Sequence, residues 1–259
     1  MWPGHPRPYA DELFSSWLAR LASSNGLPVR HFLTAIGHGP SWERDPDVTA
    51  STPLLRTLAE GTGQSIEALR TLTLAPLAGP QETPGVSGDV SWILQMDPGY
   101  RRRWRHGLQA CLRCLKEATW FKKQWRCAYV VACSLHDQIL VDRCHACQKP
   151  IRVWQLGGEK QGGILSISRR CFTCKVDLTD TAPVSIQERS LWNYSCEIEG
   201  MVTSGRAIAE SPWCRRLGES IRAIRRDDVL RKVSARVPFE RCSLAARLTI
   251  IRTLLQTKK

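Results

Sequence analysis

Apolar residues recur at the three- and four-residue spacing of amphipathic helices through the first 40 residues. The first predicted helix follows Asp11, which can cap it, and ends at Asn25-Gly26. The second begins at Pro28, which fits a first helical turn, and ends at Gly37. The inward faces hold Leu13, Phe14, Trp17, Leu18 and Leu21 in the first helix and Val29, Phe32, Leu33 and Ile36 in the second.

A second pair of helices is predicted next. Thr52-Pro53 opens one helix, a turn from Gly61 to Gln64 follows, and Ser65 can cap the other. Helix, short turn and helix is the geometry of a helix-turn-helix unit, whose second helix can enter the major groove of DNA. That helix carries one cation, Arg70, beside Glu67, whereas groove binding needs several phosphate contacts. We therefore interpret this unit as a protein-contact module, with a DNA reader as the alternative.

The C-terminal third has helical patterns again. Residues Ser185 to Glu188 match a capping box, and the helix that they open is predicted to run to about Met201. A further helical segment begins at Pro212, and Ser243 can cap a last helix.

Eight potential metal ligands lie in the middle of the chain as four pairs, and two residues separate the members of each pair. A two-residue spacer lets a tight knuckle direct both side chains at one ion, and two knuckles complete the tetrahedral shell of a structural zinc site. The sequence therefore predicts two closed sites and two Zn²⁺ per chain, with the pairs joined in sequential order. The pairs are Cys111/Cys114, Cys133/His136, Cys144/Cys147 and Cys171/Cys174.

Other interpretations of these ligands stay open. The knuckles could pair in a cross-braced order, or the cysteines could form disulfides or lie scattered in a core. A catalytic zinc would need an open coordination position, which a shell of four protein ligands does not leave. We therefore expect structural metals and no enzyme activity. A hairpin is predicted inside the second site, between Ile151 and Ile167.

Several other residues of the cysteine-rich region and its flanks are predicted to fill cores. Trp120, Phe121 and Trp125 would form the small core of the first site, because a metal module has few other apolar residues to bury. The cysteines outside the pairs are expected to act as small buried apolar residues. They are Cys127, Cys196, Cys214 and Cys242.

The net charge of +13 is unevenly distributed along the 259 residues. Residues 1–99 have a balance of −4, residues 100–259 have +17, and the segment 211–259 alone has +9. A polyanion would therefore meet the second half, although a basic surface can also serve solubility alone. The candidate nucleic-acid contacts are Arg101, Arg102, Arg103, Arg105, Arg169, Arg170, Arg215, Arg216, Arg222, Arg225 and Arg226.

These patterns predict a mainly α fold with small zinc-ribbon-like β modules. We expect an N-terminal helix-turn-helix-like domain over residues 1–74 and a proline- and glycine-rich linker over 75–91. A tandem zinc-binding region over 92–180 and a basic helical C-terminal domain over 181–259 complete the division. The absence of a secretory signal and of a long apolar run predicts a cytoplasmic protein with no membrane partner.

Two groups of residues resemble the TniQ family of transposition proteins, over roughly residues 6 to 174. The opening of the chain matches with Pro6, Pro8, Asp11-Glu12-Leu13, Ser15-Ser16-Trp17, Arg20-Leu21-Ala22 and Asn25-Gly26. The cysteine region matches with Cys111-x-x-Cys114-Leu115, Trp125, Cys133-x-x-His136, Leu140 and Cys144-x-x-Cys147. Arg113 and Ser134 replace prolines that often stand beside the ligands of the family.

This resemblance implies a non-catalytic adaptor for target selection in a bacterial transposon. Such an adaptor marks an insertion site and recruits an AAA+ ATPase regulator, which then engages the transposase. Marking would occur through target DNA, where the protein would be nucleoid-associated, or through a CRISPR Cascade-type effector complex with its guide RNA. A second copy of the chain is a further implied partner. The alternative function is a zinc-stapled transcriptional regulator that recognises one DNA sequence unaided.

Overall fold

The protein is mostly helical in a computed structural model, which describes residues 1–39, 45–75, 93–94, 108–118, 120–152, 169–204, 212, 216 and 239–256. The N-terminal helices are α1 (Phe14–Ser24), α2 (Val29–Ala35), α3 (Pro46–Thr49), α4 (Thr52–Thr62) and α5 (Ile66–Thr71). The central elements are α6 (Leu112–Glu117), η3 (Lys123–Arg126), β1 (Ala132–Cys133) and β2 (Gln138–Ile139). The chain continues with α8 (Arg189–Thr203), η5 (Phe239–Arg241) and α11 (Leu244–Gln256).

The ends of the N-terminal helices follow from local chemistry. Helix α1 stops where Gly26 takes a positive φ of 71°, a backbone conformation that glycine adopts without steric cost. Helix α5 begins where the hydroxyl of Ser65 accepts a hydrogen bond of 3.0 Å from the backbone N–H of Ala68, as predicted. The turn between α4 and α5 contains Gly63 in the left-handed region. The role of this helix pair as a protein-contact module, with a DNA reader as the alternative, stays a prediction.

Two predicted caps are wrong. Helix α1 begins at Phe14 after Leu13, and no side chain caps it. Asp11 instead contacts Trp120 at 2.8 Å and Lys122 at 3.0 Å. The predicted capping box fails because residue Ser185 pairs with Gln138 of β2, so that α8 begins only at Arg189. In both places a partner distant in the sequence takes the residue that a local pattern assigned to a helix end.

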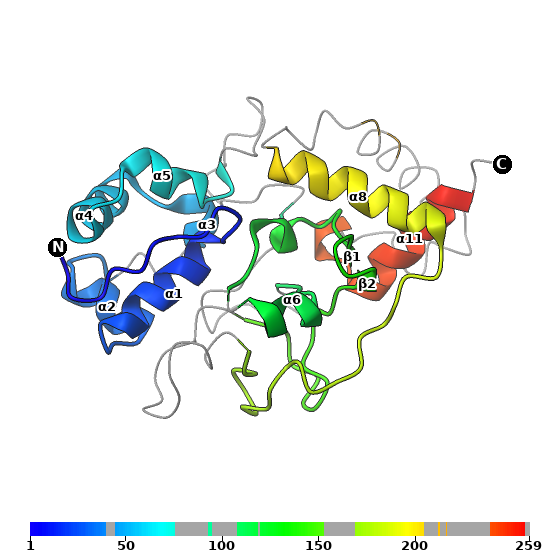
Figure 1. Cartoon of the computed structure of the whole chain (residues 1–259), viewed down its shortest axis with the longest axis horizontal. Coiled ribbons are helices and arrows are strands. Elements are labelled where there is room, and N and C mark those ends of the chain that lie inside the picture. The colour runs from blue at the N-terminus through cyan, green and yellow to red at the C-terminus, as the bar shows by residue number, and fades with distance from the viewer. Residues whose placement is uncertain are drawn as a thin grey trace.

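One hydrophobic core connects the N-terminal helices, the central elements, α8 and α11. It includes Trp17 and Leu58 of the N-terminal helices, Trp125 of η3, Ile198 of α8 and Ile251 of α11. Figure 1 shows the central elements between the N-terminal helices on one side and α8 with α11 on the other. The cysteine-rich segment is therefore the middle of the molecule, and the other parts pack against it.

The N-terminal helices join the centre through backbone pairing. The N–H of Leu13 donates to the carbonyl oxygen of Phe121 at 2.8 Å, and the N–H of Lys123 donates to that of Asp11 at 2.8 Å. Glu12 and Lys122 form an antiparallel bridge between these bonds. The segment that follows α6 thus lies directly against the entry of α1.

The C-terminal helix α11 joins the centre through apolar side chains of the common core and through the buried Arg247. Arg247 donates to the carbonyl oxygen of Ala128 at 2.6 Å and to the amide oxygen of Gln109 at 3.0 Å. Ser243 caps α11 through the N–H of Ala246 at 3.2 Å, as predicted. None of the described helices is long and apolar enough to cross a membrane.

Three predictions fall outside the described residues. They are the linker apart from its first residue, the hairpin between Ile151 and Ile167 apart from its first two residues, and most of the helical segment from Pro212. The division into domains stays a prediction.

Candidate metal centres

The eight predicted ligands form two clusters of four, in sequential pairing. Within each cluster the ligand atoms all lie within 4.8 Å of one another. The first cluster contains Cys111, Cys114, Cys133 and His136, and the second contains Cys144, Cys147, Cys171 and Cys174. Four soft donors at this separation fit the tetrahedral shell of a structural zinc ion.

A helix and a hairpin build the first cluster. Cys111 is the N-cap of α6, and Cys114 lies one turn further along the same helix. Cys133 ends β1, and His136 lies in the turn that returns to β2. This turn is tight because Asp137 takes a positive φ of 50°. Local hydrogen-bonded structure therefore fixes both halves of the cluster.

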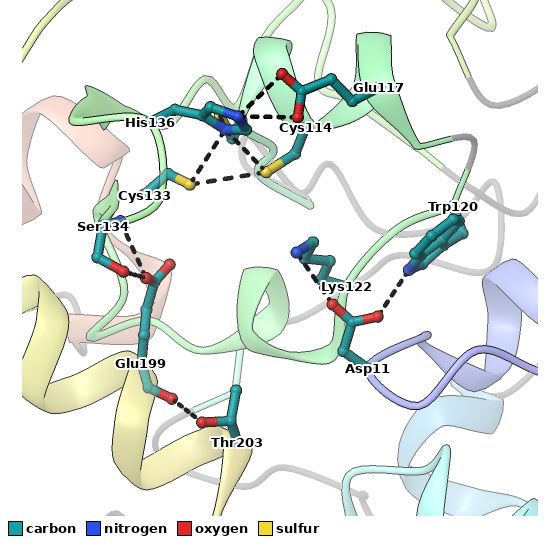
Figure 2. Close-up of polar contacts among 11 residues, drawn as sticks. Asp11, Cys114, Glu117, Trp120, Lys122, Cys133, Ser134, His136, Glu199 and Thr203 are labelled. Carbon is teal, nitrogen blue, oxygen red and sulfur yellow. Dashed lines mark hydrogen bonds and ion pairs between the residues drawn. The ribbon is translucent and has the colours of Figure 1, made fainter.

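His136 directs one ring nitrogen at the thiols and the other at a carboxylate (Figure 2). Its Nδ1 lies 3.2 Å from the sulfur of Cys114 and 3.5 Å from that of Cys111. Its Nε2 lies 3.0 Å from the nearer carboxylate oxygen of Glu117, at the end of α6. The imidazole is thus oriented for metal binding through Nδ1.

Two similar knuckles build the second cluster. The N–H of Gln148 donates to the carbonyl oxygen of Cys144 at 3.0 Å, and that of Lys175 donates to Cys171 at 2.9 Å. Gln148 and Lys175 both take a positive φ, of 58° and 65°. The Arg143–Pro150 and Arg170–Asp177 bridges flank the knuckles at equivalent positions. The second cluster is therefore a pair of matched turns, unlike the helix and hairpin of the first.

The crowding of the thiols favours a cation at the first cluster. The pKa of Cys111 falls to about 3 because the neighbouring thiols of Cys114 and Cys133 donate hydrogen bonds to it, while the pKa of Cys114 rises. Thiols this close cannot all ionise without a counter-charge. A divalent metal displaces the protons and supplies that charge, so the donor set fits zinc.

The two clusters differ in burial. All three cysteines of the first cluster are buried and belong to the common core. In the second cluster Cys144 and Cys171 are also buried in that core, while Cys147 is half-buried and Cys174 is exposed. A metal in the first cluster would therefore be enclosed by the core, whereas one in the second would lie at the edge of the core, with one exposed ligand.

Helix α8 holds the turn that carries His136. Glu199 accepts a hydrogen bond of 3.0 Å from the N–H of Ser134 and a further one from its hydroxyl (Figure 2). Trp192, two helical turns earlier, donates to the carboxylate of Asp137. Burial raises the pKa of Glu199 to about 7. The C-terminal third thus supports the ligand turn directly.

Several supporting residues carried no local signal in the sequence. Arg126, 79 residues from Asp47 in the chain, is fully buried and donates to its carboxylate at 2.6 Å. Arg126 also binds Asp45 and the carbonyl oxygen of Leu94. Only Glu117 could have been noticed, since it follows Cys114 by three residues and so shares its helix face.

The core predictions for the cysteine-rich region are largely confirmed. Phe121 and Trp125 are buried and meet edge to face at 5.8 Å between ring centroids. Trp120 is half-buried and stacks on Tyr9 of the N-terminal segment. Of the remaining cysteines, Cys127 and Cys242 are buried and Cys196 is half-buried, while Cys214 lies outside the described residues.

Most of the predicted nucleic-acid contacts are not among the described residues. Arg169 is described and binds the carboxylate of Asp177 at 2.6 Å, and Arg170 and Arg216 are exposed. Those outside the described residues are Arg101, Arg102, Arg103, Arg105, Arg215, Arg222, Arg225 and Arg226. The prediction of a basic contact surface therefore stays a prediction.

The sequence was compared with curated proteins and with models of protein families. No curated protein matches the sequence. The model of one family, TniQ, matches residues 3–140, which is more than half of the chain and includes the N-terminal helices and the whole first cluster. The protein belongs to the TniQ family, whose members act as adaptors in transposition.

Proposed function

We propose that this protein is a non-catalytic transposition adaptor. It marks the target site by contacting DNA or by docking on a CRISPR Cascade-type effector complex with guide RNA, and it recruits an AAA+ ATPase regulator that engages the transposase. The observation that carries the proposal is the extent of the family match over residues 3–140. The match joins the N-terminal helices and the first cluster, which pack in one core.

The residues of the family signature support a rigid docking unit. Glu12 is buried and accepts hydrogen bonds from Arg20 at 2.7 and 2.9 Å and from Ser16 at 3.1 Å. Ser15 donates to Asp47 through both its N–H and its hydroxyl. These polar side chains are used inside the unit, so its outer surface is available for partners.

The outer surface of α4 and α5 is the proposed contact for the ATPase. Glu60 and Glu67 are both exposed there, and the first 99 residues carry a net charge of −4. Glu60 and Glu67 are matched there by the exposed Arg56 and Arg70, so the surface lacks the group of cations that phosphate contacts need and suits a protein partner better than DNA. DNA contact is assigned to the basic second half of the chain instead.

We propose that the clusters bind two Zn²⁺ per chain as structural metals. Each ion would be held by four protein donors, which leaves no open position for a substrate or a catalytic water. The carboxylates of Asp11 and Glu12, the adjacent acidic pair near the centre, already bind Lys122 and Arg20. The site chemistry therefore favours a scaffold over a nuclease, in a protein that works in the bacterial cytoplasm.

Co-purification tests the adaptor role. The tagged protein is expected to retain its cognate AAA+ ATPase, and the double variant Glu60→Lys/Glu67→Lys is expected to retain at least tenfold less. The control is Asp180→Lys, which reverses an exposed charge beside the second cluster, away from α4 and α5. Retention of the ATPase by neither wild type nor control, with both proteins folded, would contradict the proposal.

A gel-shift titration separates the adaptor from a transcriptional regulator. An adaptor is expected to bind unrelated duplexes with similar, weak affinity that falls steeply as salt rises. A regulator would prefer one sequence by about 10³-fold or more without a partner. A strong unaided preference of that size would favour the regulator.

A further inference from the structure

His136 is the one imidazole of the first cluster, and its two nitrogens face different partners. Nδ1 lies 3.2 Å from the sulfur of Cys114, 3.5 Å from that of Cys111 and 3.8 Å from that of Cys133. A nitrogen that binds a metal carries no proton, so a neutral His136 bound through Nδ1 must carry its proton on Nε2.

The partner of Nε2 is a carboxylate from the helix that also supplies two thiols. Nε2 lies 3.0 and 3.1 Å from the two carboxylate oxygens of Glu117. Glu117 follows Cys114 by three residues on α6, so both side chains extend from one face of the helix. The same short helix can therefore bind the metal and orient the ligand on the opposite side of the cluster.

Local electrostatics oppose a carboxylate at this position. Glu117 is the last residue of α6, and the C-terminal end of a helix favours cations. A Zn²⁺ ion with three thiolates and a neutral imidazole would also have a net charge of −1, which lies next to the carboxylate of Glu117. The hydrogen bond from His136 is the described contact that offsets both effects.

We propose that Glu117 is a positioning residue of the first metal site. Its carboxylate accepts a hydrogen bond from the N–H at Nε2 of His136 and so fixes the tautomer that leaves Nδ1 free for the metal. The same hydrogen bond makes Nδ1 a stronger electron-pair donor to the metal. The inference rests on the proposed binding of zinc at this cluster. Such outer partners typically contribute 10- to 100-fold in metal affinity. Because the side chain of Glu117 is 57% exposed, while that of His136 is 9% exposed, solvent screening places the effect near the lower end, about tenfold.

Metal affinity in the full-length protein tests this role. Competition with a chromogenic zinc chelator is expected to show about tenfold weaker binding at the first cluster for Glu117→Ala, with the second cluster unchanged. Glu117→Gln, whose amide oxygen can still accept the hydrogen bond, is expected to recover part of the loss. The matched control is Lys116→Ala, an exposed neighbour on the same helix.

Two further readouts separate positioning from a general effect on the fold. Nitrogen-15 NMR of the zinc-loaded wild type is expected to show His136 protonated at Nε2, with a weaker preference in Glu117→Ala. In a His136→Cys background, Glu117→Ala is expected to leave zinc affinity unchanged, because no imidazole remains to orient. An equal loss in that background, or a loss at both clusters, would overturn the proposal.

The outcome is distinguishable from failure of the zinc assignment itself. If wild type binds no zinc at the first cluster, the metal proposal fails. If wild type binds zinc there and Glu117→Ala binds it as tightly as Lys116→Ala, only the positioning role is overturned.

Discussion

Two buried arginines each bind residues that lie far away in the sequence. Arg126 binds Asp45 and Asp47 of the N-terminal unit from within the cysteine-rich region. Arg247 of α11 donates instead to neutral acceptors, and burial lowers its pKa to about 10. A buried charge is stable only with its partners in place, so these contacts specify how the parts fit together.

Arg126→Met is predicted to destabilise the protein by about 3–5 kcal/mol, because it leaves a buried aspartate without its cation. Urea unfolding followed by circular dichroism would measure the loss. The exposed Arg113→Met is the matched control and is expected to change stability by less than about 0.5 kcal/mol. Equal effects of the two substitutions would show that the buried network contributes little.

Glu199 predicts a pH dependence. Burial raises the pKa of this carboxyl from 4.5 to about 7, so the folded state binds a proton that the unfolded state releases between these values. The stabilisation that the folded state gains from binding this proton is therefore complete below about pH 4.5 and is lost as pH rises to about 7. Relative to Glu199→Gln, the wild type should lose about 2–3 kcal/mol over this window. A pH-independent difference in unfolding free energy would contradict this.

Local sequence patterns predicted the metal ligands but not the buried ionic contacts. The metal ligands could be found because a two-residue spacing is itself the structural unit of a knuckle. Arg126 could not be found, because its partners lie 79 and 81 residues away in the chain. Glu12 belongs to the family signature of the sequence, but its role as a buried partner of Arg20 required the structure.

At the scale of elements, helix periodicity and caps located most of the described helices. Helix α3 was missed because its four residues are too few to show a period. The wrong capping box at Ser185 has the opposite cause, since a correct local motif lost to pairing with β2. Helix α8 then gains a role that no pattern indicated, because Trp192 and Glu199 hold the two ends of the turn carrying His136.

The helix caps provide a matched prediction. Ser65→Ala is expected to cost about 1 kcal/mol, because its hydroxyl accepts a 3.0 Å hydrogen bond at the start of α5. Ser51→Ala at the start of α4 is expected to cost less, because the corresponding bond is 3.4 Å long. Thermal unfolding of the two variants checks the order, and a larger loss for Ser51→Ala would contradict it.

At the scale of the whole molecule, the first cluster lies inside the common core and the second lies at its edge. Cys133→Ser is therefore expected to unfold the N-terminal helices together with the centre. Cys174→Ser, at an exposed ligand, is expected to leave most of the helical signal in place. Circular dichroism and limited proteolysis would compare them. Loss of helix in Cys174→Ser equal to that in Cys133→Ser would show that the clusters are equivalent.

The zinc content of the purified protein tests the central claim most directly. Native mass spectrometry of the full-length chain is expected to show two zinc ions per chain, with Cys174→Ser retaining the ion of the first cluster. A wild-type protein that is folded with one zinc ion, or with none, would contradict the account.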